Sequence, residues 1–530
     1  MSPFPNDVTL LGSGLFVPYK TIKMSHLRSI SFKNYRIFNE KTSFELRPLT
    51  FLTGPNSSGK SSILKSLLLL KTNFNSDLQV LDFSGAYHNL GTFENTLNRN
   101  NKSDGLMTFG FEASISSERL TSMYIKQPVT TQRSVYYVLR ELKTDQACNL
   151  IIELTYSRNE RSGKLKKIEV FLESGSDPFL NLNIGELDSD GHSLVINHEI
   201  ISKHKTLVNL FFNNSIRDSY TFRKGLKPKT YRIPSSFSIK ENSKAEYFDE
   251  PILIFGKLYE LFLDEAVSLK VDKEFHKYLV SHPLRLLLRS FASLVDNTEY
   301  LEAVRANTRR IYTNDSQGTS FNELILEYRS RIIHDKGKQF TNKWLKLFGI
   351  ADEIVFDNIE GVATTIYLKK DEEKIALADL GYGITQFLPI LLKISMEEPI
   401  LESTGKNDLK IVKKLILLEE PETNLHPKLQ SQLADFLLDA IKTFEVRFIV
   451  ETHSEYLIRK TQVLTAEKYL SVDDTVIYYF SEYTGKSNVS TISINENGST
   501  SSEFGPGFFD EAGVLKFQLL KTKAAKTSNS

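Results

Sequence analysis

The stretch Gly54-Pro55-Asn56-Ser57-Ser58-Gly59-Lys60-Ser61 decides the fold of this chain. It matches the pattern G-x-x-x-x-G-K-[ST], in which glycines let backbone N–H groups surround phosphates at a helix N-terminus. A short buried-type strand, Leu49 to Thr53, precedes it, and an apolar helix, Ile63 to Leu70, follows it. We predict that Lys60 reaches the β- and γ-phosphates of a nucleotide and that the Ser61 hydroxyl binds Mg²⁺. The predicted nucleotide ligands are Gly54, Asn56, Ser57, Ser58, Gly59, Lys60, Ser61 and Ser62.

Two further predicted strands end in polar residues. Leu415 to Leu418 is followed by Glu419-Glu420-Pro421-Glu422, and the other strand reads Phe448-Ile449-Val450-Glu451-Thr452-His453-Ser454. We expect Glu419 to help hold Mg²⁺ and Glu420 to orient and polarise the attacking water. An imidazole beside a γ-phosphate can hydrogen-bond the transferring group, which is the role we predict for His453. The alternative for His453 is an ordinary surface histidine at a strand end.

A second glycine-bearing turn opens a helix at Asp379-Leu380-Gly381-Tyr382-Gly383-Ile384-Thr385-Gln386. Its N-terminus is a second potential anion site. One phosphate can hardly lie at two helix N-termini of one subunit so arranged, so we predict that this turn faces the nucleotide of a neighbouring subunit. The residues predicted to make this contact in trans are Gly381, Gly383, Thr385 and Gln386.

These four elements, in their order along the chain, resemble the ABC-type ATPase superfamily. They are most similar to its SMC-like and OLD-like branch. The closer resemblance is carried by Phe32-Lys33-Asn34-Tyr35-Arg36, by Leu418 to Pro427, which includes the D-loop Thr423 to His426, and by Glu451-Thr452-His453-Ser454. Val304-Arg305-Ala306 and Phe508-Phe509-Asp510-Glu511 show a weaker resemblance to stretches of standalone OLD-like ATPases. Several standalone OLD-like ATPases belong to bacterial two-gene phage-defence systems such as Septu. The resemblance implies ATP and Mg²⁺ as cofactors. It also implies a head-to-tail homodimer, or a higher oligomer, in which Gly383 and Thr385 of one chain clamp ATP held by Lys60 of the other.

The sequence departs from the family pattern at several places. Glu419 stands where aspartate is commoner. No glutamine is clearly placed as a Q-loop: Gln79 is too near Lys60 in the sequence, and the segment Asn89 to Asn95 is the alternative. The 77 residues after His453 (530 − 453) are too few for the Toprim nuclease domain of OLD nucleases together with the closing strands. We therefore predict no nuclease site here, and assign any cutting to a partner.

Residue patterns along the chain predict an α/β fold with a β-rich lobe and a helical insertion between the phosphate loop and the 381–386 turn. The resemblance implies that this fold is an ABC-type P-loop ATPase head. The tail beyond Lys521 is polar and is expected to fray. The expected divisions are an N-terminal extension (1–23), the first part of the ATPase (24–115), a β-rich lobe (116–250), a helical insertion (251–348), the second part of the ATPase (349–515) and a flexible tail (516–530).

Composition limits the classes of protein this chain could be. The 530 residues carry a formal net charge of +1, which disfavours a uniformly basic nucleic-acid coat protein. Cys148 is the single cysteine, so no intramolecular disulfide and no cysteine-based metal cluster can form. No apolar run reaches the roughly 18 to 20 residues of a membrane-spanning helix, and residues 1–23 lack the features of a signal peptide. We expect a cytoplasmic protein.

A basic stretch interleaved with aromatic residues, 203–232, could contact nucleic acid through phosphates and base stacking. A solvated strand face is the alternative reading of this stretch. The residues assigned to the possible contact are Arg217, Arg223, Lys224, Lys227, Lys229 and Arg232.

The motifs predict an ATPase, and the family resemblance implies that it acts as a switch that senses nucleic acid or phage and controls a separate effector, a nuclease or toxin. Two alternatives stay open: a DNA-repair or chromosome-maintenance ATPase, and a scaffold locked by ATP with little turnover. A transporter subunit is disfavoured, because Lys60 and Gly383 are 323 residues apart (383 − 60), whereas the family resemblance implies about 100 for transporters.

Overall fold

A computed structural model describes most of the chain. The described residues are 25–76, 80–85, 88–100, 105–115, 148–173, 175–184, 192–197, 200, 229–233, 291–303, 310–313, 320–331, 333–359, 363–371, 373–397, 412–481, 489–505 and 508–527.

A six-stranded sheet forms the centre of the molecule. Its first five strands are parallel and the sixth is antiparallel. In spatial order the strands are β13 (Thr298–Leu301), β18 (Leu415–Glu419), β19 (Arg447–Glu451), β3 (Leu49–Thr53), β20 (Thr475–Phe480) and β21 (Val489–Ile492). The three strands predicted to carry the site, β3, β18 and β19, are therefore neighbours.

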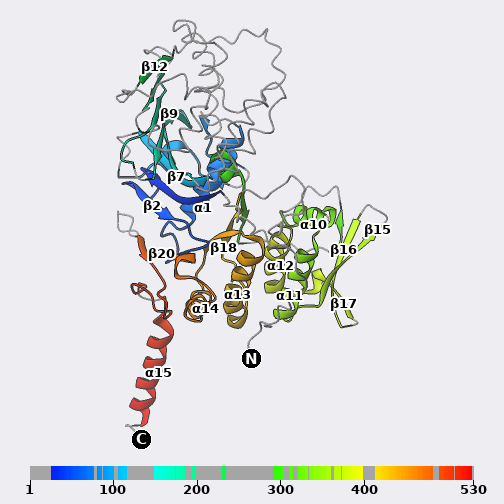
Figure 1. Cartoon of the computed structure of the whole chain (residues 1–530). Helices are drawn as coiled ribbons and strands as arrows, with labels where there is room; N and C mark the ends of the chain where they lie inside the picture. The colour runs from blue at the N-terminus through cyan, green and yellow to red at the C-terminus, as the bar shows by residue number, and fades with distance from the viewer. Residues whose placement is uncertain are drawn as a thin grey trace, which may run out of the picture.

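Both faces of this sheet are buried, as expected for parallel strands covered on each side. On one face, Leu417, Ile449 and Val476 pack with helix α1 (Ser61–Ser76). On the other face, Ile416, Phe448 and their neighbours pack against a layer of helices. These helices are α11 (Asp335–Leu347), α12 (Tyr382–Ser395), α13 (Pro427–Phe444) and α14 (Glu455–Ala466) (Figure 1).

A large antiparallel sheet covers α1 from the other side, and its apolar face belongs to the same hydrophobic cluster as α1. Its strands, in spatial order, are β12 (Lys229–Ile233), β11 (His192–Ile196), β10 (Leu180–Asn183), β9 (Ser162–Leu172), β8 (Cys148–Asn159), β7 (Leu106–Ile115), β1 (His26–Lys33) and β2 (Thr42–Glu45), with β4 (Val80–Leu81) beside β9. The predicted boundary at 115/116 runs through this sheet, because β7 pairs with β8 along its whole length. The β-rich lobe is thus continuous with the first part of the ATPase. The short elements β5 (Ser84–Gly85), β6 (His88–Asn89) and α2 (Phe93–Thr96) lie between β4 and β7 in the chain.

A smaller sheet lies beyond the helical layer (Figure 1). It contains β14 (Tyr312–Thr313), β16 (Ala363–Lys370), β15 (Glu353–Ile359) and β17 (Glu373–Ala376) and is accompanied by α10 (Ser320–Ser330). The chain leaves β17 at Ala376 and forms a 3₁₀ helix at Leu377–Asp379, just before the 381–386 turn.

The described part of the predicted helical insertion, 251–348, also contains the short strands β13 and β14. Residues 252–290 lie outside the described part of the chain, whereas α10 and α11 are helical as predicted. Before α10 in the chain, Thr298–Leu301 forms β13 and pairs with β18 in the central sheet. Four residues are too short a stretch for an apolar alternation to identify a strand, so this edge depends on pairing with a distant segment.

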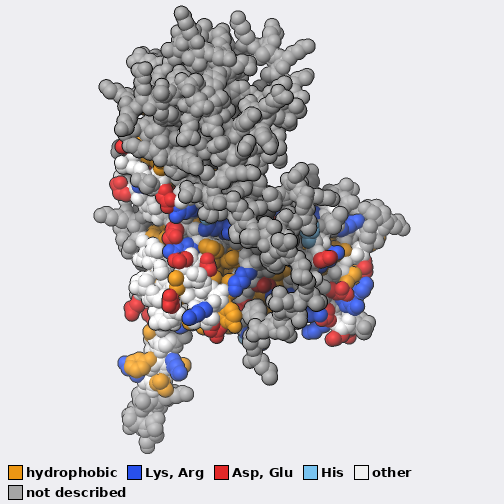
Figure 2. Space-filling model, in the orientation of Figure 1, with side chains coloured by type: hydrophobic (Ala, Val, Ile, Leu, Met, Phe, Trp, Pro, Cys, Tyr) orange, Lys and Arg blue, Asp and Glu red, His pale blue; other side chains and the backbone are white. Residues whose placement is uncertain are grey.

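Helix α15 (Glu511–Thr527) projects from the body of the molecule (Figure 1). Within the predicted tail, 516–530, residues 516–527 are helical. An aromatic cluster of Tyr479, Phe504, Phe508 and Phe509 lies at the base of the helix. Apolar and lysine side chains are exposed along α15 (Figure 2). None of the described helices is both long and apolar enough to span a membrane.

Candidate nucleotide-binding site

The phosphate loop joins β3 to α1 and needs its two outer glycines. Gly54 and Gly59 have φ angles of 134° and 104°, in the region that side chains disfavour. A Cβ on Gly54 would lie 2.0 Å from the Phe480 carbonyl oxygen, and one on Gly59 would lie 2.3 Å from the Ile37 side chain. The Lys60 ammonium folds back onto the loop and donates to the carbonyl oxygens of Gly54 (3.0 Å) and Pro55 (2.8 Å).

The predicted ligands occupy this loop and the first turn of α1, with both exposed and buried side chains. Asn56 and Ser57 are exposed, whereas Ser58, Lys60 and Ser62 are buried. Within the described part of the chain, the buried Ser58 Oγ has no hydrogen-bond partner. A buried hydroxyl without a partner is costly, so the loop is arranged for a polar ligand.

The turn Asn34 to Asn39 lies against the same loop. Part of this turn is identified from the sequence only through the family resemblance. The Ile37 side chain packs on Gly59, and Arg36 Nη1 donates to Ser62 Oγ at 3.5 Å. The Arg36 backbone N–H donates to the Thr96 carbonyl, which brings the 89–95 segment predicted as a Q-loop substitute close to this turn. Gln79 lies outside the described residues, so the identity of the Q-loop stays a prediction.

Three carboxylates stand at the carboxyl ends of β18 and β19. Glu419 and Glu451 are paired in register, and each follows its strand's alternation on the α1 face, in line with Leu417 and Ile449. Both side chains therefore leave the sheet on the side where α1 begins at Ser61. Glu420 follows in a left-handed conformation (φ 41°). Its N–H donates to the Glu451 carbonyl oxygen at 2.8 Å, and its carboxylate accepts from Thr423 Oγ1 at 3.1 Å.

Glu451 is the residue that connects these acids to the phosphate loop. Its Oε1 accepts a hydrogen bond from Ser61 Oγ (3.0 Å) and lies 4.0 Å from Lys60 Nζ. The pKa of Glu451 is raised to about 7, chiefly by burial; Glu419 and Glu420 also raise it, while the Ser61 hydrogen bond and Lys60 lower it. Burial also lowers the pKa of Lys60.

Glu451 has no role among the residues predicted from the sequence. The signal was present, because the alternation from Phe448 to Glu451 places Glu451 on the α1 face. Only the pairing of β19 with β3 shows that the phosphate loop begins beside it.

Glu419 has a partner on the neighbouring strand. The Tyr300 hydroxyl, from β13, hydrogen-bonds Glu419, and burial together with this acid raises the pKa of Tyr300. The predicted Mg²⁺ carboxylate is therefore held by a tyrosine, and the predicted Mg²⁺ hydroxyl, that of Ser61, is held by Glu451.

His453 lies just beyond β19 and has an exposed side chain. Partial desolvation and the charge of Lys60 lower its pKa, while Glu420 acts in the opposite direction. Its backbone N–H donates to Glu422 Oε1 at 2.7 Å. Burial raises the pKa of Glu422. The lowered pKa favours the neutral form of the His453 imidazole, whose charge is coupled to those of Lys60 and Glu420.

The 381–386 turn packs against the D-loop of its own chain. A Cβ on Gly383 would lie 2.3 Å from the Asn424 carbonyl oxygen, so only glycine fits there. Gly381, the N-cap residue of α12, is exposed, whereas the side chains of Thr385 and Gln386 are buried. The surface that the start of α12 offers to another molecule therefore includes Gly381 and does not include the Thr385 and Gln386 side chains.

The possible nucleic-acid contact is only partly within the described residues. Arg217, Arg223, Lys224 and Lys227 lie outside them, as does Val304-Arg305-Ala306. Lys229 and Arg232 belong to β12, which pairs with β11 at the edge of the large sheet. This contact remains a prediction.

The residues at this sheet edge fit a magnesium–nucleotide. No group of three or more His, Cys, Asp or Glu side chains in the described part of the chain could hold a metal ion. Mg²⁺ in phosphate-transferring proteins is usually bound by one or two carboxylates, a loop hydroxyl and the phosphates themselves. Ser61 and Glu419 provide a hydroxyl and a carboxylate here, and the Ser61–Glu451 hydrogen bond leaves the lone pairs of Ser61 free for a metal.

Comparisons with known proteins identify two matching families. Residues 26–458 match the family described as AAA ATPase domain, and residues 470–519 match one described as protein of unknown function (DUF3696). No curated protein matches the chain.

Solved structures with a similar chain course include heads of SMC proteins. The SMC head domain from Thermotoga maritima is 10% identical, with a TM-score of 0.35 over 88% of this chain and 98% of that one. The Smc head domain from Pyrococcus furiosus, bound to the C-terminal domain of ScpA, is 13% identical, with a TM-score of 0.37 over 89% and 97%. The Smc head domain with a coiled coil and joint from Pyrococcus yayanosii gives 10% and 0.38 over 90% and 98%. All of these TM-scores are below 0.5.

The family match spans the phosphate loop, the 381–386 turn and the ends of β18 and β19, so it covers the whole of this site. The α/β fold predicted from the sequence is confirmed. This chain belongs to the AAA ATPase domain family.

Proposed function

We propose that this protein is an ATP-hydrolysing switch that closes around ATP as a dimer and controls a separate effector, a nuclease or toxin, in bacterial antiphage defence. One observation carries the ATPase part of the proposal: Lys60, Ser61 and the carboxylates of Glu419, Glu420 and Glu451 meet at one edge of the central sheet. The defence role rests on the resemblance to standalone OLD-like ATPases.

In this proposal each group has a distinct task. The loop N–H groups and Lys60 bind the triphosphate, and Ser61 and Glu419 would hold Mg²⁺, which neutralises phosphate charge when it is bound. The Glu420 backbone is left-handed and is held by its hydrogen bond to Glu451, and its carboxylate accepts a hydrogen bond from Thr423 Oγ1. Glu420 polarises the attacking water, and the neutral imidazole of His453 hydrogen-bonds the γ-phosphate.

The second subunit contributes the start of α12. Gly381 is exposed there and its helix N-terminus favours an anion, whereas Thr385 and Gln386 are buried beneath it. We therefore assign the contact in trans to the backbone at Gly381 and Gly383, with Thr385 and Gln386 supporting the turn from within. Gly383 links this turn to the D-loop through Asn424, so closure of the dimer would be felt at Glu420, which lies just before Asn424 in the chain.

Glu420→Gln tests the hydrolytic part of the proposal. This variant should bind ATP as well as the wild type, lose hydrolysis by about 100-fold or more, and accumulate as an ATP-dependent dimer. Light scattering after gel filtration measures the dimer, and phosphate release measures hydrolysis. Normal turnover in the variant would remove Glu420 from the water-polarising role, and wild-type protein that dimerises on ATP without turnover would favour the ATP-locked scaffold.

Gly381→Arg is the matched test of the contact in trans. It adds a bulky side chain at an exposed position where nothing in the described part of the chain lies within 4 Å of an added Cβ, so folding should be unaffected. We expect unchanged binding of ATP to the monomer and loss of the dimer trapped by Glu420→Gln. Dimers of the double variant that are as stable as those of Glu420→Gln alone would show that α12 does not face the partner's nucleotide.

The defence role is tested in cells. The chain should lower phage plaque numbers only when it is expressed with its effector, and Lys60→Ala should abolish that protection. Protection that is independent of Lys60 would contradict control by ATP. Sensitivity to DNA damage in cells that lack the protein, without any change in plaque numbers, would favour the DNA-repair or chromosome-maintenance alternative.

A further inference from the structure

Glu451 contacts or approaches three groups of the proposed site, Ser61, Lys60 and Glu420. Through its side chain it touches Ser61 and approaches Lys60, and through its carbonyl oxygen it holds the N–H of Glu420. Nothing in the predicted chemistry of the phosphate loop or of the Glu419-Glu420 pair requires an acid on the next strand.

The burial of this acid is unusual for a residue with no function. Glu451 is 7% exposed, and within the described part of the chain its Oε2 atom has no hydrogen-bond partner. A buried carboxylate oxygen without a donor is costly, unless a ligand supplies positive charge or a donor. The nearest cation, Lys60 Nζ, lies 4.0 Å from the other oxygen, and it is already bonded to the carbonyls of Gly54 and Pro55.

The position of Glu451 points to a divalent cation as that ligand. Glu451 and Glu419 are in register on adjacent parallel strands, which places their Cα atoms about 4.8 Å apart and their side chains on the same face. The Ser61 hydroxyl, the predicted metal ligand of the loop, donates a hydrogen bond to Glu451, so the lone pairs of its oxygen can still coordinate a cation. Two carboxylates and one hydroxyl then border the same spot.

We propose that Glu451 is the second carboxylate of the Mg²⁺ site: it orients the Ser61 hydroxyl in the nucleotide-free protein and contributes its free oxygen to the metal shell when Mg²⁺–ATP is bound. This deepens the proposed function and rests on it, because it concerns the metal of the same site. Glu419, held by Tyr300, is the first carboxylate.

The role can be separated from simple structural support by measuring how Mg²⁺ changes nucleotide affinity. Binding of a fluorescent ATP analogue is titrated with Mg²⁺ and in EDTA, for the wild type and for Glu451→Gln. Glutamine keeps the shape and can accept the Ser61 hydrogen bond, but it carries no charge. We expect the Mg²⁺-dependent gain in affinity to fall about 10- to 100-fold, while affinity in EDTA is unchanged or higher.

Mn²⁺ provides a readout that does not involve turnover. Electron paramagnetic resonance should show tight nucleotide-dependent Mn²⁺ binding in the wild type and weaker binding in Glu451→Gln. Glu397→Gln is the matched control, because Glu397 is a similarly buried carboxylate that is paired with Lys414 at the opposite end of the sheet. It should leave both the Mg²⁺ dependence and the Mn²⁺ signal at wild-type values.

The outcomes separate this inference from the proposed function. Wild-type protein that binds no ATP analogue would overturn the proposed function itself. Wild-type protein that binds the analogue, with the same Mg²⁺ dependence and Mn²⁺ signal in Glu451→Gln, would overturn only the role of Glu451 at the metal.

Discussion

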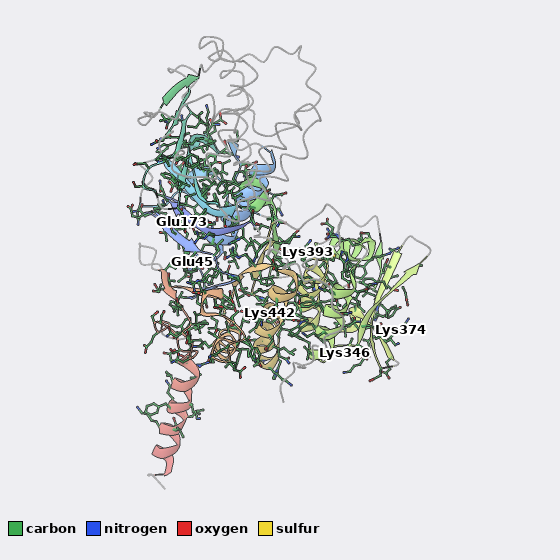
Figure 3. The ribbon with its side chains drawn as sticks, viewed as in Figure 1. Glu45, Glu173, Lys346, Lys374, Lys393 and Lys442 are labelled. Carbon is green, nitrogen blue, oxygen red and sulfur yellow. The ribbon has the colours of Figure 1, made fainter. Side chains whose placement is uncertain are left out.

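The two ends of the central parallel strands carry opposite kinds of charge arrangement. At the amino ends of β13 and β18, Lys414 Nζ lies 3.2 Å from Glu299 Oε1 and 2.8 Å from Glu397 Oε1. Lys393, labelled in Figure 3, lies 3.5 Å from Glu299 Oε2 where α12 meets the sheet. At the carboxyl ends of β18 and β19, the acids Glu419, Glu420 and Glu451 have Lys60 as their nearby cation, 4.0 Å from Glu451.

The pKa values follow this difference. At the amino ends, burial opposes charging, yet Lys414 and Lys393 hold the pKa of Glu299 below its usual value, and Glu397 and Glu299 raise that of Lys414. At the carboxyl ends, burial wins, so the pKa of Glu451 rises to about 7 and that of Lys60 falls. At the amino ends, the acidic and basic side chains compensate one another and connect α12 to the sheet. At the carboxyl ends, the carboxylates outnumber the nearby basic side chains of the described residues, and a bound cation would compensate the excess negative charge.

Lys414→Met should have the largest effect on stability. Removing this cation leaves Glu397 and Glu299 partly buried with less compensation, which we expect to cost about 3 kcal/mol of unfolding free energy. Urea denaturation measures the loss, and binding of an ATP analogue to the folded variant should match that of the wild type. A stable variant would show that the network at this end is not structural.

Lys60→Met is the same substitution at the opposite end and should have the reverse pattern. The affinity for ATP should fall roughly 10- to 100-fold, because a charge-assisted contact to phosphate is lost. The melting temperature without nucleotide should stay close to that of the wild type, since the burial of Lys60 is unfavourable to its charge. Strong destabilisation by Lys60→Met would remove the contrast between the two ends.

Glu451→Gln should cause a small change in how stability depends on pH. Because the folded pKa of about 7 exceeds the ordinary 4.5, the folded protein binds more protons between these values, and its stability falls as pH rises through this window. The variant lacks this loss, so its melting temperature relative to the wild type should increase by about 1–3 °C from pH 5 to pH 8, without nucleotide.

Glu397→Gln serves as the control for this pH experiment. It should lower the melting temperature at both pH values, because it removes a carboxylate that is paired with Lys414. A difference in melting temperature between Glu451→Gln and the wild type that is the same at both pH values would contradict the raised pKa of Glu451.

Local sequence patterns determined much of the fold and the site. The phosphate loop, the helix after it and the strands ending at Glu419 and Glu451 were all predictable, because alternation and helical periodicity are properties of short segments. The required glycines at 54 and 59 follow from the same local geometry. Glu420 and His453 could be singled out because each comes just after a buried apolar strand.

The tertiary structure decided which of these segments are neighbours. Nothing within Thr298 to Leu301 identifies β13, and its place beside β18 brings Tyr300 to Glu419. The contact between Ser61 and Glu451 joins residues 390 positions apart. Strand order is set by burial and hydrogen bonding between distant segments, and no local sequence pattern contains this information. The acidic residues could therefore be identified from the sequence, but only the folded sheet shows that Glu451 lies beside the phosphate loop.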